Sequence, residues 1–188
     1  MARPKEFEEE AAIDAAIAVF REHGYEGTSA QMLVDAMGIG RQSLYNTFGD
    51  KWGIYRAAVR RYGVCETNAH REALASRPAA IDGVRAMLER VVSEAERGCL
   101  GVGSIVEFGQ LHAELTEIRA ATGGVLRDLF IRTIERGQVE GDIAIDLDPG
   151  TVATFIVASI AGIRIAARGS ASPKHLAALV DLALRALR

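Results

Sequence analysis

Cysteine, proline and aromatic residues are all scarce in this sequence of 188 residues. Its 2 cysteines, Cys65 and Cys99, are too few for a disulfide framework, which favours a reducing environment such as the cytoplasm. The 4 prolines and the scarcity of β-branched runs favour helices over strands. The sequence therefore predicts an all-α, cytoplasmic protein.

The sequence also lacks a run that would enter or cross a membrane. The first ten residues, MARPKEFEEE, contain no apolar segment of the kind found in signal peptides. The most apolar stretch, residues 149–163, is shorter than the roughly 20 residues that cross a bilayer. We therefore expect no membrane partner.

Motifs of enzymes are missing as well. The 4 histidines, His23, His70, His112 and His175, are scattered without the carboxylate or cysteine spacing of a metal site. The sequence contains neither a nucleophile motif nor a glycine-rich phosphate loop. We therefore expect a protein that is not an enzyme and needs no metal or cofactor. A small α-helical enzyme and a helical protein-interaction module remain the alternatives.

Charge is distributed unevenly along the chain. The net charge of -3 argues weakly against nucleic acid, but residues 28–62 carry more basic than acidic side chains. The basic ones are Arg41, Lys51, Arg56, Arg60 and Arg61. Upstream, Arg3 and Lys5 would form a short basic arm. Because affinity for DNA depends on local phosphate contacts, such a patch on an acidic protein is compatible with DNA binding.

Glycines and capping residues divide the first part of the chain into short helices. The first helix is predicted to begin near Phe7 and to end at Gly24. The second follows a cap at Thr28 or Ser29, and Gly38 ends it. Two further helices follow, the third short and the fourth long.

The third predicted helix, roughly residues 41–47, is too short to be stable alone and carries many hydrogen-bonding side chains. Two helices joined by a tight turn with glycine, the second short and polar, form a helix-turn-helix. Its second helix enters the major groove of DNA. A helix of about seven residues is only about 10 Å long. We therefore expect a dimer that binds a palindromic site.

Residues 15–59 resemble the N-terminal DNA-binding domain of the tetracycline-repressor (TetR) family. The shared pattern is an aromatic before a Gly-aromatic turn, a Thr or Ser at the start of the second helix, a Gly-Ile turn, and Leu-Tyr-x-x-Phe-x-x-Lys. The matching residues are Phe20, Gly24, Tyr25, Thr28, Ser29, Gly38, Ile39, Leu44, Tyr45, Phe48 and Lys51. The sequence departs from the pattern at Gly40, where the family often has a capping Ser, and at Gly53, where it is often acidic.

The resemblance implies DNA contacts at eight positions. Those implied to face bases or the phosphates beside them are Arg41, Gln42, Ser43 and Asn46. Those implied to contact phosphates are Tyr45, Thr47 and Lys51, with Thr28 capping the second helix and touching the DNA backbone. The residues themselves leave alternatives open, since Tyr45 can be a half-buried aromatic and Gln42 a solvated surface residue.

The remainder of the chain is predicted to form longer amphipathic helices, giving about nine helices in total. They cover about residues 79–96, 105–112, 115–138, 149–168 and 174–187, with an interruption at RGCLGVGS and a weak spot at Gly123-Gly124. We predict a DNA-binding domain at residues 6–66 and a second domain at residues 67–188. By resemblance, the second domain binds a small-molecule effector and forms a homodimer.

The residues of this second domain are assigned less directly. The predicted effector pocket consists of Met87, Val91, Ile105, Phe108, His112, Leu126, Phe130 and Arg164. The predicted dimer interface consists of Phe155, Ile156, Ser159, Ile160, Ile163, Leu176, Leu179, Val180 and Leu184.

Three residues of this domain have two interpretations each. Arg164 either pairs with a carboxylate or binds an anionic effector, and His112 is either an ordinary satisfied histidine or a ligand contact. Cys99 is either a redox or electrophile sensor or an inert small hydrophobe. Its segment, RGCLGVGSIVEFG, resembles part of one TetR subgroup but does not name an effector. We predict a ligand-responsive transcriptional regulator, a repressor, that binds a palindromic operator.

Overall fold

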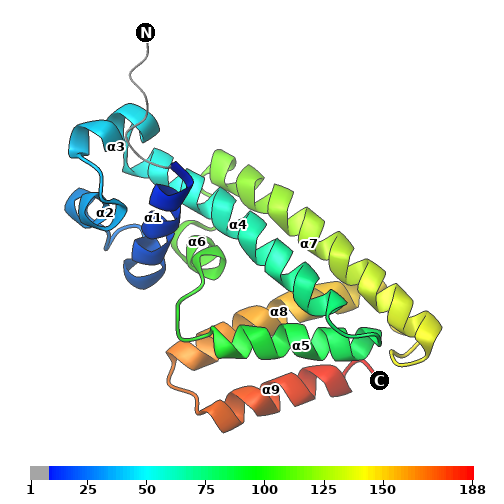
Figure 1. Ribbon diagram of the computed structural model, residues 1–188. Coiled ribbons are helices and arrows are strands. Elements are labelled where there is room, and N and C mark those ends of the chain that lie inside the picture. Colours follow the sequence, from blue (N-terminus) through cyan, green and yellow to red (C-terminus); the bar gives the residue numbers. More distant parts are fainter. Residues whose placement is uncertain (1–8) are drawn as a thin grey trace. The chain divides into compact units, whose positions relative to one another are not determined.

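The computed structural model describes residues 9–188, which form nine helices and no strand (Figure 1). This confirms the predicted all-α fold. The basic arm predicted at Arg3 and Lys5, and the helix start predicted near Phe7, lie outside the described residues.

The chain divides into two compact units that are not contiguous in sequence. The first extends to Val64 and also includes Cys99–Ala120, and the second consists of Cys65–Gly98 and Ala121–Arg188. Helices α4 (Lys51–Ala75) and α7 (Ala113–Glu140) contribute residues to both units. The predicted domain limits, 6–66 and 67–188, therefore differ from the compact units mainly at residues 99–120, which belong to the first unit.

The first unit contains α1 (Glu9–His23), α2 (Ala30–Met37), α3 (Arg41–Phe48) and α6 (Leu100–Phe108) besides the first part of α4 and the start of α7. Its core is formed by large apolar side chains from each of these helices, among them Phe20, Leu33, Leu44, Ile54 and Leu115. Burial of these side chains stabilises helices that are too short to persist alone.

Tyr25 follows α1 and lies at the centre of an aromatic cluster in the first unit. Its ring centroid is 5.0 Å from that of Tyr55, 5.5 Å from that of Trp52 and 5.4 Å from that of Phe108. Tyr55 in turn contacts Phe20 edge to face at 4.9 Å. Aromatic pairs in such geometry add to the stabilisation from burial alone, so this cluster fixes the chain between α1 and α2.

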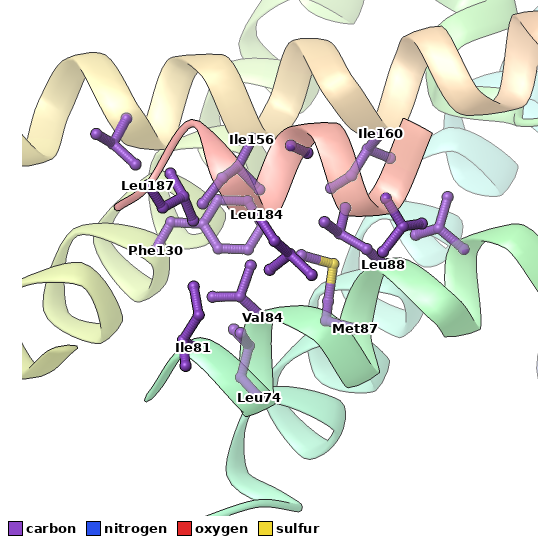
Figure 2. Close-up of a cluster of buried hydrophobic side chains, with 14 of the residues drawn as sticks. Leu74, Ile81, Val84, Met87, Leu88, Phe130, Ile156, Ile160, Leu184 and Leu187 are labelled. Carbon is purple, nitrogen blue, oxygen red and sulfur yellow. The ribbon is translucent and has the colours of Figure 1, made fainter. Parts of the chain in front are cut away.

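The second unit contains α5 (Ala80–Ser93), α8 (Pro149–Arg168) and α9 (Pro173–Arg185), together with parts of α4 and α7. Figure 2 shows side chains of α5, α8 and α9 pointing into one apolar cluster, together with Phe130 of α7 and Leu74 of α4. Helices α8 and α9 begin with proline after capping side chains of Asp148 and Ser172. Proline suits this position because its missing N–H would have no helical partner there.

The interruption predicted at RGCLGVGS is confirmed in part, because α5 ends at Ser93 and α6 begins at Leu100, whereas the weak spot predicted at Gly123-Gly124 does not break α7. Helix α6 starts at Leu100 and includes Gly101 and Gly103, and α7 runs unbroken through Gly123 and Gly124. A glycine inside a helix costs only about 1 kcal/mol. Packing of the buried side of each helix therefore outweighs that cost.

Helix α8 has 20 residues and, among the described helices, is the one whose length and composition would allow it to cross a membrane. The apolar stretch considered from the sequence, residues 149–163, is therefore shorter than the helix that contains it. One such helix does not by itself indicate a membrane span, because core helices of proteins without membrane spans share this length and composition. Here α8 gives Val152, Ile156, Ile160 and Ile163 to the core of the second unit.

Charged side chains interrupt this apolar core at one place. The Oε2 atom of Glu66 accepts from Arg164 Nη2 at 2.6 Å and from Arg90 Nη2 at 3.3 Å. Arg90 Nη2 also lies 3.2 Å from His70 Nδ1. Because a guanidinium only donates, His70 Nδ1 must be the acceptor, and the neutral ring carries its proton on Nε2.

The position of His70 predicts how stability depends on pH. Burial, with Arg90 beside the ring, lowers the pKa of His70 to about 4, whereas an unfolded histidine has a pKa of about 6.5. Between these values the unfolded chain binds a proton that the folded chain does not. The free energy of unfolding should therefore fall as the pH is lowered from about 6.5 to about 4, by about 3 kcal/mol.

Urea unfolding of the wild-type protein and of His70→Gln across this pH range measures this contribution. We expect the variant to lose that part of the pH dependence, while His112→Gln, at an exposed histidine, should keep it. A pH dependence in His70→Gln that equals the wild-type one would contradict the assignment.

Candidate nucleic-acid interface

The turn between α2 and α3 sets the position of the short helix that the sequence predicts to bind DNA. Gly38 ends α2 in the left-handed conformation, with φ of 64°, which favours glycine. Ile39 is buried in the turn. Helix α3 then starts at Arg41, after the N-cap residue Gly40, which offers no side-chain cap. The orientation of α3 therefore depends on the buried Ile39 and Leu44.

The face of α3 opposite Leu44 carries exposed polar side chains. Arg41, Gln42 and Asn46 are exposed. Gln42 Nε2 donates to Asn46 Oδ1 at 3.0 Å, so the two amides are joined along one side of the helix. The other three predicted contact residues of α3 are half-buried: Ser43, Tyr45 and Thr47.

Arg41 also contacts α2. Its Nη2 donates to Gln31 Oε1 at 3.4 Å, and Gln31 Nε2 donates to Asp35 Oδ1 at 2.8 Å. Gln31 was not among the residues predicted to contact DNA. Gln31 and Asp35 lie four residues apart on α2, and this spacing predicts contact between their side chains. The contact of Gln31 with Arg41 has no such local pattern, because it depends on the turn between α2 and α3.

Thr28 and Lys51 do not present free polar groups. Thr28 is buried, and its hydroxyl donates to the Gly24 carbonyl at 2.6 Å. Lys51 Nζ donates to the carbonyls of Tyr25 at 2.9 Å and Thr28 at 3.0 Å. The cap of α2 is Ser29, whose hydroxyl accepts from the Met32 amide. The side-chain role given to Thr28 is therefore corrected, because this hydroxyl already has a backbone partner.

Glu107 on α6 holds the same turn from the other side. Both of its carboxylate oxygens accept from the Tyr25 amide, at 3.0 and 3.1 Å. A Cβ on Gly24, where φ is +68°, would lie 2.4 Å from Glu107 Oε1, so only glycine fits there. The Tyr25 N–H is thus bound by a carboxylate and the Tyr25 carbonyl by an ammonium group.

In the segment RGCLGVGSIVEFG, Cys99 and Leu100 have structural roles at the start of α6. Cys99 caps α6, because its sulfur accepts from the Val102 amide at 3.4 Å. The Tyr62 hydroxyl donates to the same sulfur at 3.5 Å. Leu100 is buried in the core of the first unit. The segment therefore begins the helix that brings Glu107 to the turn.

The predicted pocket residues are divided between the two units. Ile105, Phe108 and His112 belong to the first unit, where the His112 ring lies 4.6 Å from that of Trp52. In the second unit, three of the predicted residues are core side chains, Leu126 packs against them and Arg164 is paired with Glu66. The core side chains are Met87, Val91 and Phe130. Within the described part of the chain, no group of three or more His, Cys, Asp or Glu side chains is arranged to hold a metal ion.

Comparison with known proteins finds regulators of transcription. A family model described as bacterial regulatory proteins, tetR family, matches residues 12–58, and one described as tetracyclin repressor-like, C-terminal domain, matches residues 77–183. An uncharacterized HTH-type transcriptional regulator of Bacillus subtilis, YezE, is 30% identical over 196 residues and covers 100% of both chains. The HTH-type transcriptional repressor ComR of Escherichia coli is 28% identical over 194 residues, which is 97% of this chain and 90% of ComR.

A solved structure extends this similarity to three dimensions. It contains a cysteine mutant of the TetR family transcriptional regulator CifR complexed with 26-bp double-strand operator DNA. The two chains are 32% identical, the alignment covers 99% of this chain and 100% of that one, and the TM-score is 0.84.

The contacts of Lys51 predict a structural role for this residue. Lys51→Met leaves the carbonyls of Tyr25 and Thr28 without their charged donor, so we expect the free energy of unfolding to fall by about 1–3 kcal/mol. Arg60→Met removes a positive charge from an exposed position on the same helix and should change it by less than about 0.5 kcal/mol. Urea unfolding checks both values, and equal effects of the two substitutions would exclude this role.

Proposed function

The chain belongs to the tetR family of bacterial regulatory proteins, and from this we propose that it binds a palindromic operator as a homodimer and leaves it when a small-molecule effector binds. It is a DNA-binding transcriptional regulator and not an enzyme, as the sequence predicted. Relatives such as ComR are named as repressors, which supports repression as its action. We also propose a cytoplasmic location, where a bacterial regulator meets its DNA.

The observation that carries the operator proposal is the exposed face of α3. Arginine pairs with the two acceptors of guanine, and glutamine or asparagine pairs with the donor and acceptor of adenine, in the major groove. Arg41, Gln42 and Asn46 are exposed on one short helix and supply these groups. We assign them to base edges.

The half-buried residues of α3 fit contacts with phosphates. Hydroxyl groups commonly donate to phosphate oxygens, which position a protein without reading sequence. We assign this role to Ser43, Tyr45 and Thr47. Lys51 remains a phosphate contact only if its remaining N–H donor reaches the DNA, since two carbonyls already accept from its ammonium group.

Selection of bound fragments from random DNA by the purified protein tests these assignments. Gln42→Ala should change the preferred base at one position of each half-site, because a base contact is worth about 1–3 kcal/mol of discrimination. Gln110→Ala, at an exposed glutamine in the same unit, should leave the selected sequence unchanged. Tyr45→Phe should weaken binding about equally for all sequences.

Failure to recover a palindrome with folded wild-type protein would contradict the operator proposal. An unchanged sequence from Gln42→Ala would remove this residue from the bases.

The homodimer is proposed to form through the solvent side of α8 and α9. Six residues predicted for the interface instead lie in the core of their own chain: Ile156, Ile160, Ile163, Leu176, Val180 and Leu184. Leu179 packs against that core, and Phe155 and Ser159 retain exposed surface. The prediction assigned the wrong side because both sides of α8 are apolar, and a helical repeat alone does not say which one is buried.

The exposed side of these helices has the character of an interface between chains. Phe155, Ile165 and Leu182 are 39%, 58% and 53% exposed. Between them on α8 lie the small exposed residues Ala158 and Gly162, which would allow a second helix to approach closely. A pair of helices from each chain can form a four-helix interface with twofold symmetry.

Replacement of an apolar residue on this side by a charged one tests the dimer. Ile165→Glu should give monomers on size exclusion with light scattering, since a buried unpaired carboxylate opposes association, and should lower operator affinity. Val139→Glu makes the same chemical change on α7 at a residue that is 89% exposed and should leave the dimer intact. A dimer that persists in Ile165→Glu would place the interface elsewhere.

A further inference from the structure

The strongest unexplained feature of the second unit is its cluster of buried charges. Arg164 and His70 are 2% and 3% exposed. The side chains of Glu66 and Arg90 are 19% and 18% exposed. One edge of the cluster therefore meets solvent, while Arg164 and His70 lie behind it. This arrangement resembles a small polar site with an open side more than an isolated ion pair.

Three helices supply the cluster. Glu66 and His70 lie on α4, Arg90 on α5 and Arg164 on α8. Both guanidinium groups donate to one oxygen of Glu66, and Arg90 Nη1 donates to Glu94 at 3.0 Å. Although burial raises the pKa of the Glu66 carboxyl, Arg164 and Arg90 together hold it below its usual value. The site therefore holds a carboxylate in its charged form.

Donors outnumber acceptors around Arg90. Its named acceptors are Glu66, Glu94 and His70 Nδ1. Its Nε is buried and has no hydrogen-bond partner within the described residues. A buried donor without an acceptor is unfavourable. The site thus lacks an acceptor, which a bound anion can supply.

Stability of the unit does not by itself account for the cluster. The surrounding core contains Met87, Phe130 and Ile163, and apolar residues of similar volume often replace buried ion pairs without loss of stability. Clusters of buried charged groups with shifted ionisation are instead frequent at functional sites. Ligand binding would therefore give these charges a role.

We propose that Arg90 and Arg164 bind the carboxylate of a small organic acid, which replaces Glu66 between the two guanidinium groups. This inference rests on the proposed function, because it names the chemical class of the effector. The exchange keeps one negative charge beside the arginines, and Glu66 turns toward the solvent edge of the cluster. The apolar core around the cluster suits an acid with an apolar body. Release of Glu66 also removes the link from α4 to α5 and α8.

The first experiment compares benzoate with benzamide, which has nearly the same shape but no charge. Calorimetric titration of the full-length wild-type protein at constant ionic strength should show about tenfold or more tighter binding of benzoate. Benzoate should also weaken binding to the operator recovered by selection, while benzamide at the same concentration should not.

Variants locate the binding site. Arg90→Gln should reduce the preference for benzoate by about tenfold. The double variant Glu66→Met with Arg164→Met removes both partners of the buried pair, which avoids leaving one charge unpaired, and should abolish the preference. Arg85→Gln, on the same helix but paired with Asp181, should keep it. Circular dichroism shows whether each variant is folded, and Arg90→Gln tests the site if the double variant is not.

The possible outcomes are distinct. Equal binding of benzoate and benzamide, binding of neither at millimolar concentration, or an unchanged preference in Arg90→Gln would overturn the inference. Tighter binding of benzoate that depends on Arg90, with operator affinity unchanged, would support the carboxylate site and contradict its role in release. If the wild-type protein without any ligand does not bind an operator, that result would instead contradict the proposed function.

Discussion

The backbone of Tyr25 is held at both its N–H and its carbonyl, and the DNA-binding unit depends on this. Glu107 accepts from its N–H, and Lys51 donates to its carbonyl. Its ring packs among Tyr55, Trp52 and Phe108. Because the cap of α2, Ser29, lies four residues later and α2 itself begins at Ala30, the position of α2 follows from that of the Tyr25 backbone. The position of α3 follows in turn through the tight turn at Gly38.

In the first unit, the charged groups of Glu107 and Lys51 position backbone atoms. Hydrogen bonds between a carboxylate or an ammonium group and backbone atoms are stronger than hydrogen bonds between neutral groups. They also fix the direction of the chain, which apolar contacts do not. In the second unit, by contrast, the charged groups contact one another within a core of apolar side chains.

Local pattern was enough to predict the helix-turn-helix, but contacts distant in sequence were not predictable. Glycines, caps and apolar spacing located α2 and α3, because these signals act within a few residues. The bond from Tyr25 to Glu107 joins residues 82 positions apart, and nothing local to either residue indicates it. Resemblance to the family assigned Lys51 to phosphates, whereas nothing in the sequence indicated the two carbonyls that accept from it. On α8, apolar residues on both sides left the buried side undetermined.

The exposed face of α3 has a consequence for how such regulators diversify. Arg41, Gln42 and Asn46 contribute no side chain to the buried core, so exchanging them has little effect on folding. Ile39 and Leu44, which orient the helix, are not exposed to DNA. With these three residues at base edges, as we propose, mutation there can explore new target sequences while the scaffold stays intact. A duplicated copy of the gene could drift toward a different set of promoters without first acquiring compensating changes elsewhere.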